Sequence, residues 1–477
     1  MGDTKTQSTV VDEEFEAIAD LEKLKDCFEC GICTASCPVH ELLDGYYNPR
    51  ILLETLFLEK TAITGEEGLW LCAWCYRCYK RCPQGLKPPE IFNNAKNLAV
   101  RRGVTEPMEK ALARILSSIP LPLVTLRLCF HPERAGIDEA LLEELVSKTY
   151  EREVLSRKPE TEKHVDKKVA VIGAGPAGLT LAYELSRKGY PVTVFDALPE
   201  PGGMLRKCIP TFRLPREVLD KEISRLQELG VTFKTKVKIG ENLDFQKLWK
   251  EGYKAVFVAA GAHKCRELRV EGVELEGVIH ALDFLSKANS GEKANIGEKV
   301  VVIGGGNVAV DSARTALRQG AKEVKIIYRR SRAEMPAIPW EVSEAEKEGV
   351  KIEFLASPKR FIGENGKLKA VECLRMQLGE PDASGRRKPI PIEGSEFTEE
   401  ADTAILAIGE SPDVSFLPEE VELNPDGTVW INPITMETTM KGVFAGGDVA
   451  TGPATVIEAV LAGKKAAYSI AKYLEET

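Results

Sequence analysis

Residues 168–178 read KVAVIGAGPAG and predict the fold of the larger part of the chain. The apolar run indicates a buried strand, and the glycines open a helix whose N-terminus can stabilise a pyrophosphate. Asp196 closes the next apolar run, 23 residues after Gly173, where an acid is expected to bind a ribose hydroxyl. We therefore expect a dinucleotide site that includes Gly173, Ala174, Gly175, Pro176, Ala177, Gly178 and Asp196.

A second unit of the same kind follows at 299–311, which read KVVVIGGGNVAVD. Alanine replaces the third glycine, a substitution that the fingerprint allows. Three arginines stand after the next strand, where an NAD site would carry an acid, and arginines there can bind the 2′-phosphate of NADP. NAD, with the arginines as a solvated basic loop, is the alternative. The expected site comprises Gly304, Gly305, Gly306, Asn307, Val308, Ala309, Arg329, Arg330 and Arg332.

Apolar β-rich runs alternate with helical stretches from Lys168 onward, which indicates parallel sheets with crossover helices. The expected strands include Val169–Ile172, Val192–Phe195, Ala255–Ala259, Val300–Ile303, Val324–Tyr328 and Thr403–Ala407. The first 102 residues favour helices instead, over Glu41–Leu58 and Pro89–Arg102. The expected class is α/β, with two Rossmann-like domains behind a helical domain. The expected boundaries are 1–102, a helical connector at 103–166, then 167–290, 291–409 and 410–477.

Eight of the 12 cysteines lie in the first 82 residues, in two runs of the form C-x2-C-x2-C-x3-C-P. In two-cluster ferredoxins this spacing holds two [4Fe-4S] clusters, and the fourth cysteine of each run binds the other cluster. We assign Cys27, Cys30, Cys33 and Cys82 to cluster I, and Cys72, Cys75, Cys78 and Cys37 to cluster II. Structural zinc is the alternative, but it favours two pairs of cysteines separated by a longer loop.

Composition excludes several other classes of function. The net charge of -9 offers no footprint for nucleic acid or an anionic membrane surface. No apolar run approaches the ~20 residues of a membrane span, and Met1–Asp20 has no apolar core of a secretory signal. We therefore expect a cytoplasmic protein, in a compartment where cysteines are ligands rather than disulfides. The polar run Ser156–Lys168 is interpreted as a linker.

Three features between and within the cysteine runs carry a family resemblance. The residues 47–50 (YNPR), the residues 71–78 (LCAWCYRC) and the interval between the runs resemble the C subunit of heterodisulfide reductases. The resemblance covers roughly the first 100 residues. It implies a small helical domain whose two [4Fe-4S] clusters relay electrons between subunits.

From Lys168 to the C-terminus, residues 201–206 (PGGMLR), 209–215 (IPTFRLP) and 445–448 (AGGD) carry a second resemblance. The sequence is similar to the small subunit of glutamate synthase and to the flavoprotein half of dihydropyrimidine dehydrogenase. The resemblance implies an adrenodoxin-reductase-like pair of domains, with FAD held by 167–290 and 410–477 and NAD(P)H by 291–409. The implied further FAD contacts are Gly203, Leu205, Arg206, Val237, Gly261, Gly447, Asp448 and Thr455.

In that family the aspartate at 448 meets the flavin ribityl chain, and the helix starting near Thr455 points its N-terminus at the isoalloxazine. Such a helix terminus would stabilise negative charge on reduced flavin. This sequence departs from the family pattern at Asp196, Cys208 and Ala260, where glutamate, glycine and threonine are usual. Related adrenodoxin-reductase-like proteins carry further cluster cysteines before the FAD domain. Cys129 lies in a segment that resembles a remnant of that region, with most of the cluster ligands missing.

These features predict an iron–sulfur flavoprotein oxidoreductase that transfers electrons between NAD(P)H and a partner redox subunit or ferredoxin-like protein. No catalytic side chain is expected, because hydride transfer between nicotinamide and flavin depends on orientation. No site for a terminal substrate is recognisable, so a hetero-oligomer is expected. The alternative is an electron-transfer adaptor of a bifurcating or heterodisulfide-reductase-like complex, with a non-functional nicotinamide site.

Overall fold

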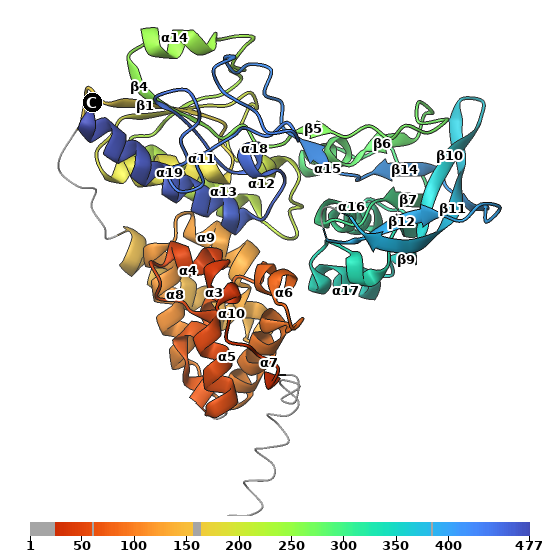
Figure 1. The fold of residues 1–477 in the computed structure, drawn as a ribbon, viewed down its shortest axis with the longest axis horizontal. Coiled ribbons are helices and arrows are strands. Elements are labelled where there is room, and N and C mark those ends of the chain that lie inside the picture. The colour runs from red at the N-terminus through yellow and green to blue at the C-terminus, as the bar shows by residue number, and fades with distance from the viewer. Residues whose placement is uncertain (1–23, 60–61, 156–163, 383–384) are drawn as a thin grey trace, which may run out of the picture.

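The computed structural model describes residues 24–59, 62–155, 164–382 and 385–477. Figure 1 shows a helical part built from the first third of the chain, below an α/β part that contains the C-terminus. A second α/β part extends to one side. The expected α/β class is confirmed by two parallel five-stranded sheets. Most of the predicted linker and all of Met1–Asp20 lie outside the described residues.

The helical part joins the cysteine-rich segment and the expected connector into one packed body, since α8 contacts η2 and η4 contacts α7. Its elements are α3 (Ile32–Ala35), α4 (Pro38–Leu42), α5 (Pro49–Leu58), η1 (Ala62–Gly65), η2 (Glu67–Leu71), α6 (Arg77–Arg81), α7 (Pro88–Arg101), α8 (Glu106–Ser118), α9 (Pro122–Thr125), the π-helical η3 (Leu126–Phe130), η4 (Pro132–Ala135), α10 (Glu139–Tyr150) and the π-helical η5 (Glu151–Leu155).

The segment Glu41–Leu58, expected to be helical, is divided between two helices, because the chain turns between α4 and α5. Gly45 has a φ of +87°, in the left-handed region. The Asn48 side chain then caps α5 by accepting from the N–H groups of Arg50 and Ile51, and Pro49 starts the helix. The residues that cause this break, Gly45, Asn48 and Pro49, all lie within or beside the turn itself.

The first α/β part has the strand order β16-β4-β1-β2-β3, with every pairing parallel. Its elements are β1 (Lys168–Ile172), α11 (Pro176–Arg187), β2 (Val192–Phe195), α12 (Met204–Lys207), α13 (Arg216–Glu228), β3 (Thr232–Lys234), α14 (Phe245–Lys250), β4 (Tyr253–Val258), β16 (Val443–Ala445), α18 (Asp448–Thr451) and α19 (Val456–Glu476). The chain therefore leaves this sheet after β4 and returns to it at β16.

The second α/β part has the parallel order β6-β14-β7-β8-β9 and carries an antiparallel sheet that was not predicted. Its elements are β6 (Val278–His280), α15 (Ala281–Asn289), β7 (Lys299–Ile303), α16 (Asn307–Arg318), β8 (Glu323–Tyr328), η6 (Arg332–Glu334), α17 (Pro339–Lys347), β9 (Lys351–Phe354), β10 (Ala356–Glu364), β11 (Lys367–Pro381), β12 (Arg387–Pro391), β13 (Phe397–Glu400) and β14 (Thr403–Leu406). A two-stranded pair, β5 (Lys264–Cys265) and β15 (Glu410–Ser411), connects the two α/β parts.

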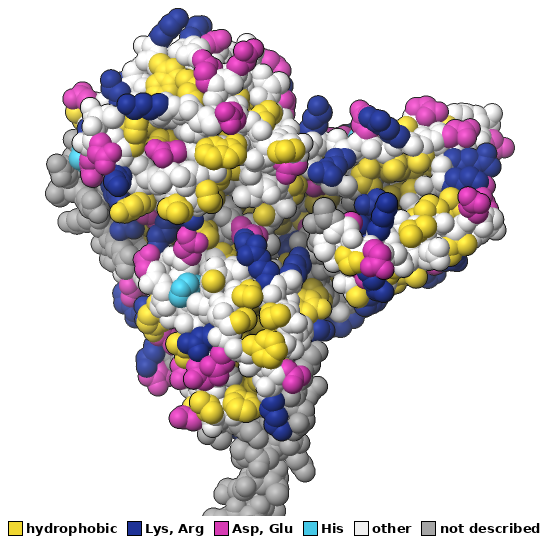
Figure 2. All heavy atoms as spheres, in the orientation of Figure 1, with side chains coloured by type: hydrophobic (Ala, Val, Ile, Leu, Met, Phe, Trp, Pro, Cys, Tyr) yellow, Lys and Arg dark blue, Asp and Glu magenta, His cyan; other side chains and the backbone are white. Residues whose placement is uncertain are grey.

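The helical part packs directly on the first α/β part. Helix α4 contacts α19, and α9 contacts α13, so one apolar core runs from Leu24 to Leu474. Figure 2 shows exposed apolar side chains on the helical part, interspersed with charged ones. Among the described residues, no helix has the length and apolar character needed to cross a membrane.

Candidate functional site

The glycines of the first turn have two kinds of surroundings. A Cβ on Gly173, whose φ is +106°, would lie 2.3 Å from the carbonyl oxygen of Ala259, and one on Gly178 would lie 2.0 Å from that of Gly173. A Cβ on Gly175 would meet nothing within 4 Å. The first and third glycines therefore permit close packing of strand and helix. The second leaves space at the N-terminus of α11, where a pyrophosphate fits.

Asp196 directly follows β2 and is held by the backbone. Its carboxylate accepts from the N–H groups of Ala174 at 2.6 Å and Leu198 at 2.7 Å. Burial raises the pKa of Asp196, although these two bonds oppose the shift. The fixed carboxylate borders the same space as Gly175, so a ribose hydroxyl there would meet an oriented acceptor.

These residues line one cavity of about 770 Å³, within the size range of cofactor sites. Burial raises the pKa of Asp448 in its wall to about 7, and Asp448 accepts from the N–H of Ala454 at 3.2 Å. Thr455 caps α19 through a reciprocal capping box with Glu458. Of the expected FAD contacts, the lining includes Gly173, Gly175, Pro176, Ala177, Asp196, Gly203, Leu205, Val237, Gly261, Gly447, Asp448 and Thr455.

Three residues predicted for this site do not line the cavity. Ala174 contributes its N–H to Asp196, and Gly178 packs against Gly173. Arg206 turns away: its Nε donates to the carbonyl oxygen of Pro201 at 2.8 Å, and its guanidinium pairs with Asp220. Arg206 therefore holds the loop that precedes α12.

The second turn repeats the geometry of the first. A Cβ on Gly304 would lie 2.1 Å from the carbonyl oxygen of Ala407, and one on Gly305 would lie 2.4 Å from the Tyr328 ring. A Cβ on Gly306 would meet nothing within 4 Å, so open space again faces the N-terminus of a helix, α16. Asn307 and Val308 also line the large cavity, and Ala309 is buried. The two nucleotide turns therefore open toward a shared space.

The three arginines predicted to bind a 2′-phosphate have different environments. Arg330 is 3% exposed, and its guanidinium donates to Asp382 at 2.5 Å and to the carbonyl oxygen of Arg387 at 2.7 Å. Arg332 pairs with Glu346. Arg329 is exposed, and its side chain makes no hydrogen bond or ion pair within the part of the chain that the structure describes. Only Arg329 is therefore both accessible and without a competing partner there.

The structure groups the eight cysteines across the two runs. Cys27, Cys30, Cys33 and Cys82 line one small pocket, together with Arg50 and Leu53. Burial raises the pKa of Cys37 far above its usual range, and the neighbouring Cys75 and Cys72 thiols raise it further. Cys37 therefore lies beside the second run, while Cys82 lies beside the first. Helices α3 and α6, which carry Cys33 and Cys78, are in contact.

This grouping fits the donor set of two cubane clusters. Burial raises the pKa of Cys75 to about 12, and a thiol with so high a pKa becomes a thiolate when a metal binds it. A cubane cluster would distribute four such thiolates over separate iron atoms.

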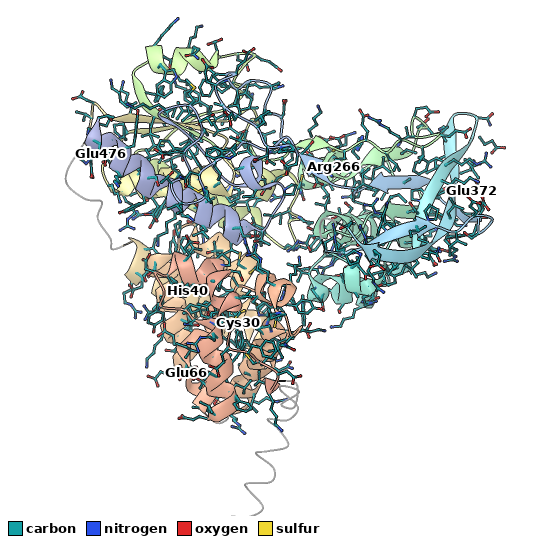
Figure 3. All side chains as sticks on the ribbon, viewed as in Figure 1. Cys30, His40, Glu66, Arg266, Glu372 and Glu476 are labelled. Carbon is teal, nitrogen blue, oxygen red and sulfur yellow. The ribbon has the colours of Figure 1, made fainter. Side chains whose placement is uncertain are left out.

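The two cysteine groups differ in exposure. Cys30 is exposed, and Phe28 beside it is 70% exposed. Figure 3 labels Cys30 on the helical part. Cys72 is buried, and Cys75 with Trp74 forms part of the wall of the 770 Å³ cavity. The second group thus borders the nucleotide cavity, and the first approaches the surface.

Sequence reasoning missed the residues that join the three parts. Arg213 donates to both carboxylate oxygens of Asp311, at 2.7 and 2.9 Å. Glu341 accepts from Arg134 of the helical part at 2.9 Å and from Arg314 at 2.8 Å. Partners 98 and 207 positions apart leave no local pattern that could have revealed them.

Comparison with known proteins gives two family matches. Residues 167–463 match the model described as pyridine nucleotide-disulphide oxidoreductase, and residues 23–86 match the 4Fe-4S dicluster domain. The second match supports clusters over the zinc alternative.

Three relatives show which proteins the chain resembles. It is 42% identical to the NADP(+)-dependent formate dehydrogenase subunit beta of Moorella thermoacetica, over 84% of this chain and 60% of the relative. It is 36% identical to the NADPH-Fe(3+) oxidoreductase subunit beta of Geobacter sulfurreducens (strain DL-1 / KN400), over 98% and 74%. It is 39% identical to the glutamate synthase [NADPH] small chain of Azospirillum brasilense, over 64% and 66%. The chain thus spans less than two thirds of the first and third relatives.

Proposed function

This chain belongs to the pyridine nucleotide-disulphide oxidoreductase family, with a 4Fe-4S dicluster domain in front, and from this premise we propose that it passes electrons between NADPH and a partner redox subunit. The two family matches confirm the expected cofactors, which are FAD and a pyridine nucleotide for the α/β parts and two [4Fe-4S] clusters for the helical part.

One observation carries the proposal: Cys75 and Asp448 line the same cavity. Residues expected to hold FAD and a cysteine of the second group therefore border the same space. When bound, FAD exchanges two electrons with nicotinamide, and the clusters accept them singly. Cluster II, held by Cys72, Cys75, Cys78 and Cys37, is then the one beside FAD. Cluster I, held by Cys27, Cys30, Cys33 and Cys82, is the one near the surface.

The residues of the cavity orient the cofactor rather than perform acid–base chemistry. Gly175 and the N-terminus of α11 would receive the pyrophosphate, and Asp196 a ribose hydroxyl. Helix α19 begins directly after Thr455, which lines the cavity. The partial positive charge of this helix N-terminus favours negative charge in the cavity. The buried Asp448, with its raised pKa, can donate or accept near neutral pH.

NADPH is the proposed nucleotide because Arg329 offers an accessible cation directly after Tyr328, whose ring lies against Gly305 of the second glycine turn. The names of the three relatives also contain NADP or NADPH. Two of them are beta subunits and one is a small chain, which supports a place in a hetero-oligomer. A cytoplasmic location follows from the same proposal, because eight thiols must stay reduced to bind iron.

Anaerobic titration with NADPH and then NADH tests this function, with flavin absorbance and cluster EPR followed together. We expect NADPH to bleach the flavin and reduced-cluster signals to appear. Bleaching by NADH alone would contradict the role of Arg329. If neither nucleotide bleaches the flavin while dithionite reduces the clusters, the chain is an adaptor without a working nicotinamide site.

A further inference from the structure

Lys96, on α7, is a lysine buried without a polar partner. Its side chain is 1% exposed, and Nζ has no hydrogen-bond partner among the described residues. The Trp70 ring centroid lies 5.7 Å from Nζ. Lysine is almost never fully buried unless it is paired, because a desolvated ammonium is costly. The Lys96 ammonium therefore requires a negatively charged partner that the described residues do not place within hydrogen-bond distance of Nζ.

The charges around Lys96 indicate where that anion belongs. Burial lowers the pKa of Lys96 to about 8, and negative charge at Cys72 and at Glu133 would oppose that shift. Glu133 accepts from His131 at 3.0 Å, and the Arg134 cation beside it counteracts its influence on Lys96. Trp70 lies two residues before Cys72, and α7 contacts η2, so Nζ lies beside the segment that leads into the second cysteine run.

We propose that Lys96 is a positioning residue of cluster II, whose ammonium offsets the negative charge of the four thiolates and raises the reduction potential of that cluster. This inference rests on the proposed assignment of Cys72, Cys75, Cys78 and Cys37 to one cluster. A fixed positive charge in a region of low dielectric favours the more negative, reduced form. The cluster beside the flavin thereby becomes the better electron acceptor.

The test is an EPR-monitored redox titration of the purified holoprotein and its Lys96→Met variant. The cluster II signal is identified as the one missing from Cys75→Ala. At a fixed potential, we expect the reduced-to-oxidised ratio of cluster II to fall at least tenfold, equivalent to 59 mV for one electron. Cluster I should change less, and iron content should not change. Lys110→Met, an exposed change on α8, is the matched control.

Lys96→Arg and Lys96→Gln keep the inference testable if the methionine variant does not fold. A cluster II reduction potential that stays the same in Lys96→Arg and falls in Lys96→Gln supports the charge effect. An unchanged cluster II potential in Lys96→Met or Lys96→Gln, with normal iron content, would overturn it and leave the Trp70 contact as the role of Lys96. Because dithionite can drive this titration, failure of NADPH to reduce the flavin would count against the proposed function and not against Lys96.

Discussion

Arg77 and Glu458 form an ion pair across 381 positions of sequence. Arg77 lies between Cys75 and Cys78, and Glu458 is in the first turn of α19. The other oxygen of Glu458 accepts from the hydroxyl and the N–H of Thr455, at 2.6 and 3.0 Å. One carboxylate therefore ties the loop of the second cysteine group to the helix terminus at the flavin cavity.

Replacing Arg77 with methionine should slow the transfer of electrons from flavin to the clusters. Loss of the ion pair frees the loop to shift relative to α19, and a misplacement of about 1 Å at a reacting site reduces rates by roughly ten- to a hundredfold. Stopped-flow spectroscopy should show normal flavin reduction by NADPH and delayed cluster reduction. Arg81→Met, an exposed change on the same helix, should show neither effect. An equal delay in both phases would contradict the positioning role.

The surroundings of Gly175 and Gly178 predict different defects when each glycine is replaced by alanine. Gly175→Ala should give a folded protein that loses FAD, because the new methyl group meets no protein atom but occupies space assigned to the pyrophosphate. Gly178→Ala should fail to fold, because its methyl group would lie 2.0 Å from the carbonyl oxygen of Gly173. Flavin content and circular dichroism distinguish the two. Tight FAD binding by Gly175→Ala would refute the assignment.

The crossed cysteine grouping predicts which variants share a phenotype. Cys82→Ala should lose the same EPR signal as Cys30→Ala, and Cys37→Ala the same as Cys75→Ala, because each fourth cysteine lies beside the other run. Each variant should retain about half of the iron. A Cys37→Ala spectrum that matches Cys30→Ala would show that each run binds its own cluster.

Arg329→Ala should weaken the preference for NADPH. A charge-assisted bond to the 2′-phosphate contributes about 1.5–3 kcal/mol, so KM for NADPH should rise roughly ten- to a hundredfold while KM for NADH stays constant. Arg360→Ala removes an exposed arginine from β10 and serves as the control. Equal KM changes for both nucleotides would place Arg329 outside the phosphate site.

Glu222 predicts a pH-dependent contact between the helical part and the first α/β part. Its carboxyl on α13 accepts from the N–H of Leu123 at 2.6 Å, and burial raises its pKa to about 7. The folded state holds this proton between pH ~4.5 and 7, where the unfolded chain has lost it, so stability falls as pH rises through that window.

Glu222→Gln keeps an acceptor but cannot ionise, so its stability relative to wild type should rise by a few kcal/mol from pH 5 to pH 7.5. Thermal unfolding at both pH values measures the difference. Glu228→Gln, an exposed change on the same helix, should show no such trend. If the difference in stability between Glu222→Gln and wild type is the same at pH 5 and pH 7.5, the carboxyl is already ionised at pH 5.

Local patterns account for the parts of the fold that the sequence predicts. The glycine turns at Gly173 and Gly304 combine a strand, a sharp turn and a helix within about 15 residues, so the sequence pattern reveals them even though the first glycine of each packs against a distant carbonyl group. The antiparallel sheet also had a local signal. Asn365-Gly366 joins β10 and β11, and both residues have positive φ, of +53° and +78°, as a two-residue hairpin requires.

The remaining parts depend on distant residues that no local pattern brings together. Arg330 occupies a position typical of phosphate binding, yet Asp382, 52 positions away, engages it. Lys96 resembles any lysine of an amphipathic helix until packing buries it beside Trp70 and the second cysteine group. Long-range charge pairing thus decides which predicted residues remain available to a ligand.

The β5–β15 pair gives the nucleotide-binding part the character of an exchangeable module. The N–H of Arg266 donates to the carbonyl oxygen of Gly409 at 3.0 Å, so the two ends of the inserted segment lie side by side. Figure 3 labels Arg266 at this junction. Insertions whose ends are adjacent can be gained or replaced without disturbing the host. Evolution, or a protein engineer, can therefore change the coenzyme by splicing at one place, provided the new segment restores the Asp311–Arg213 and Glu341–Arg134 pairs that join it to the other two parts.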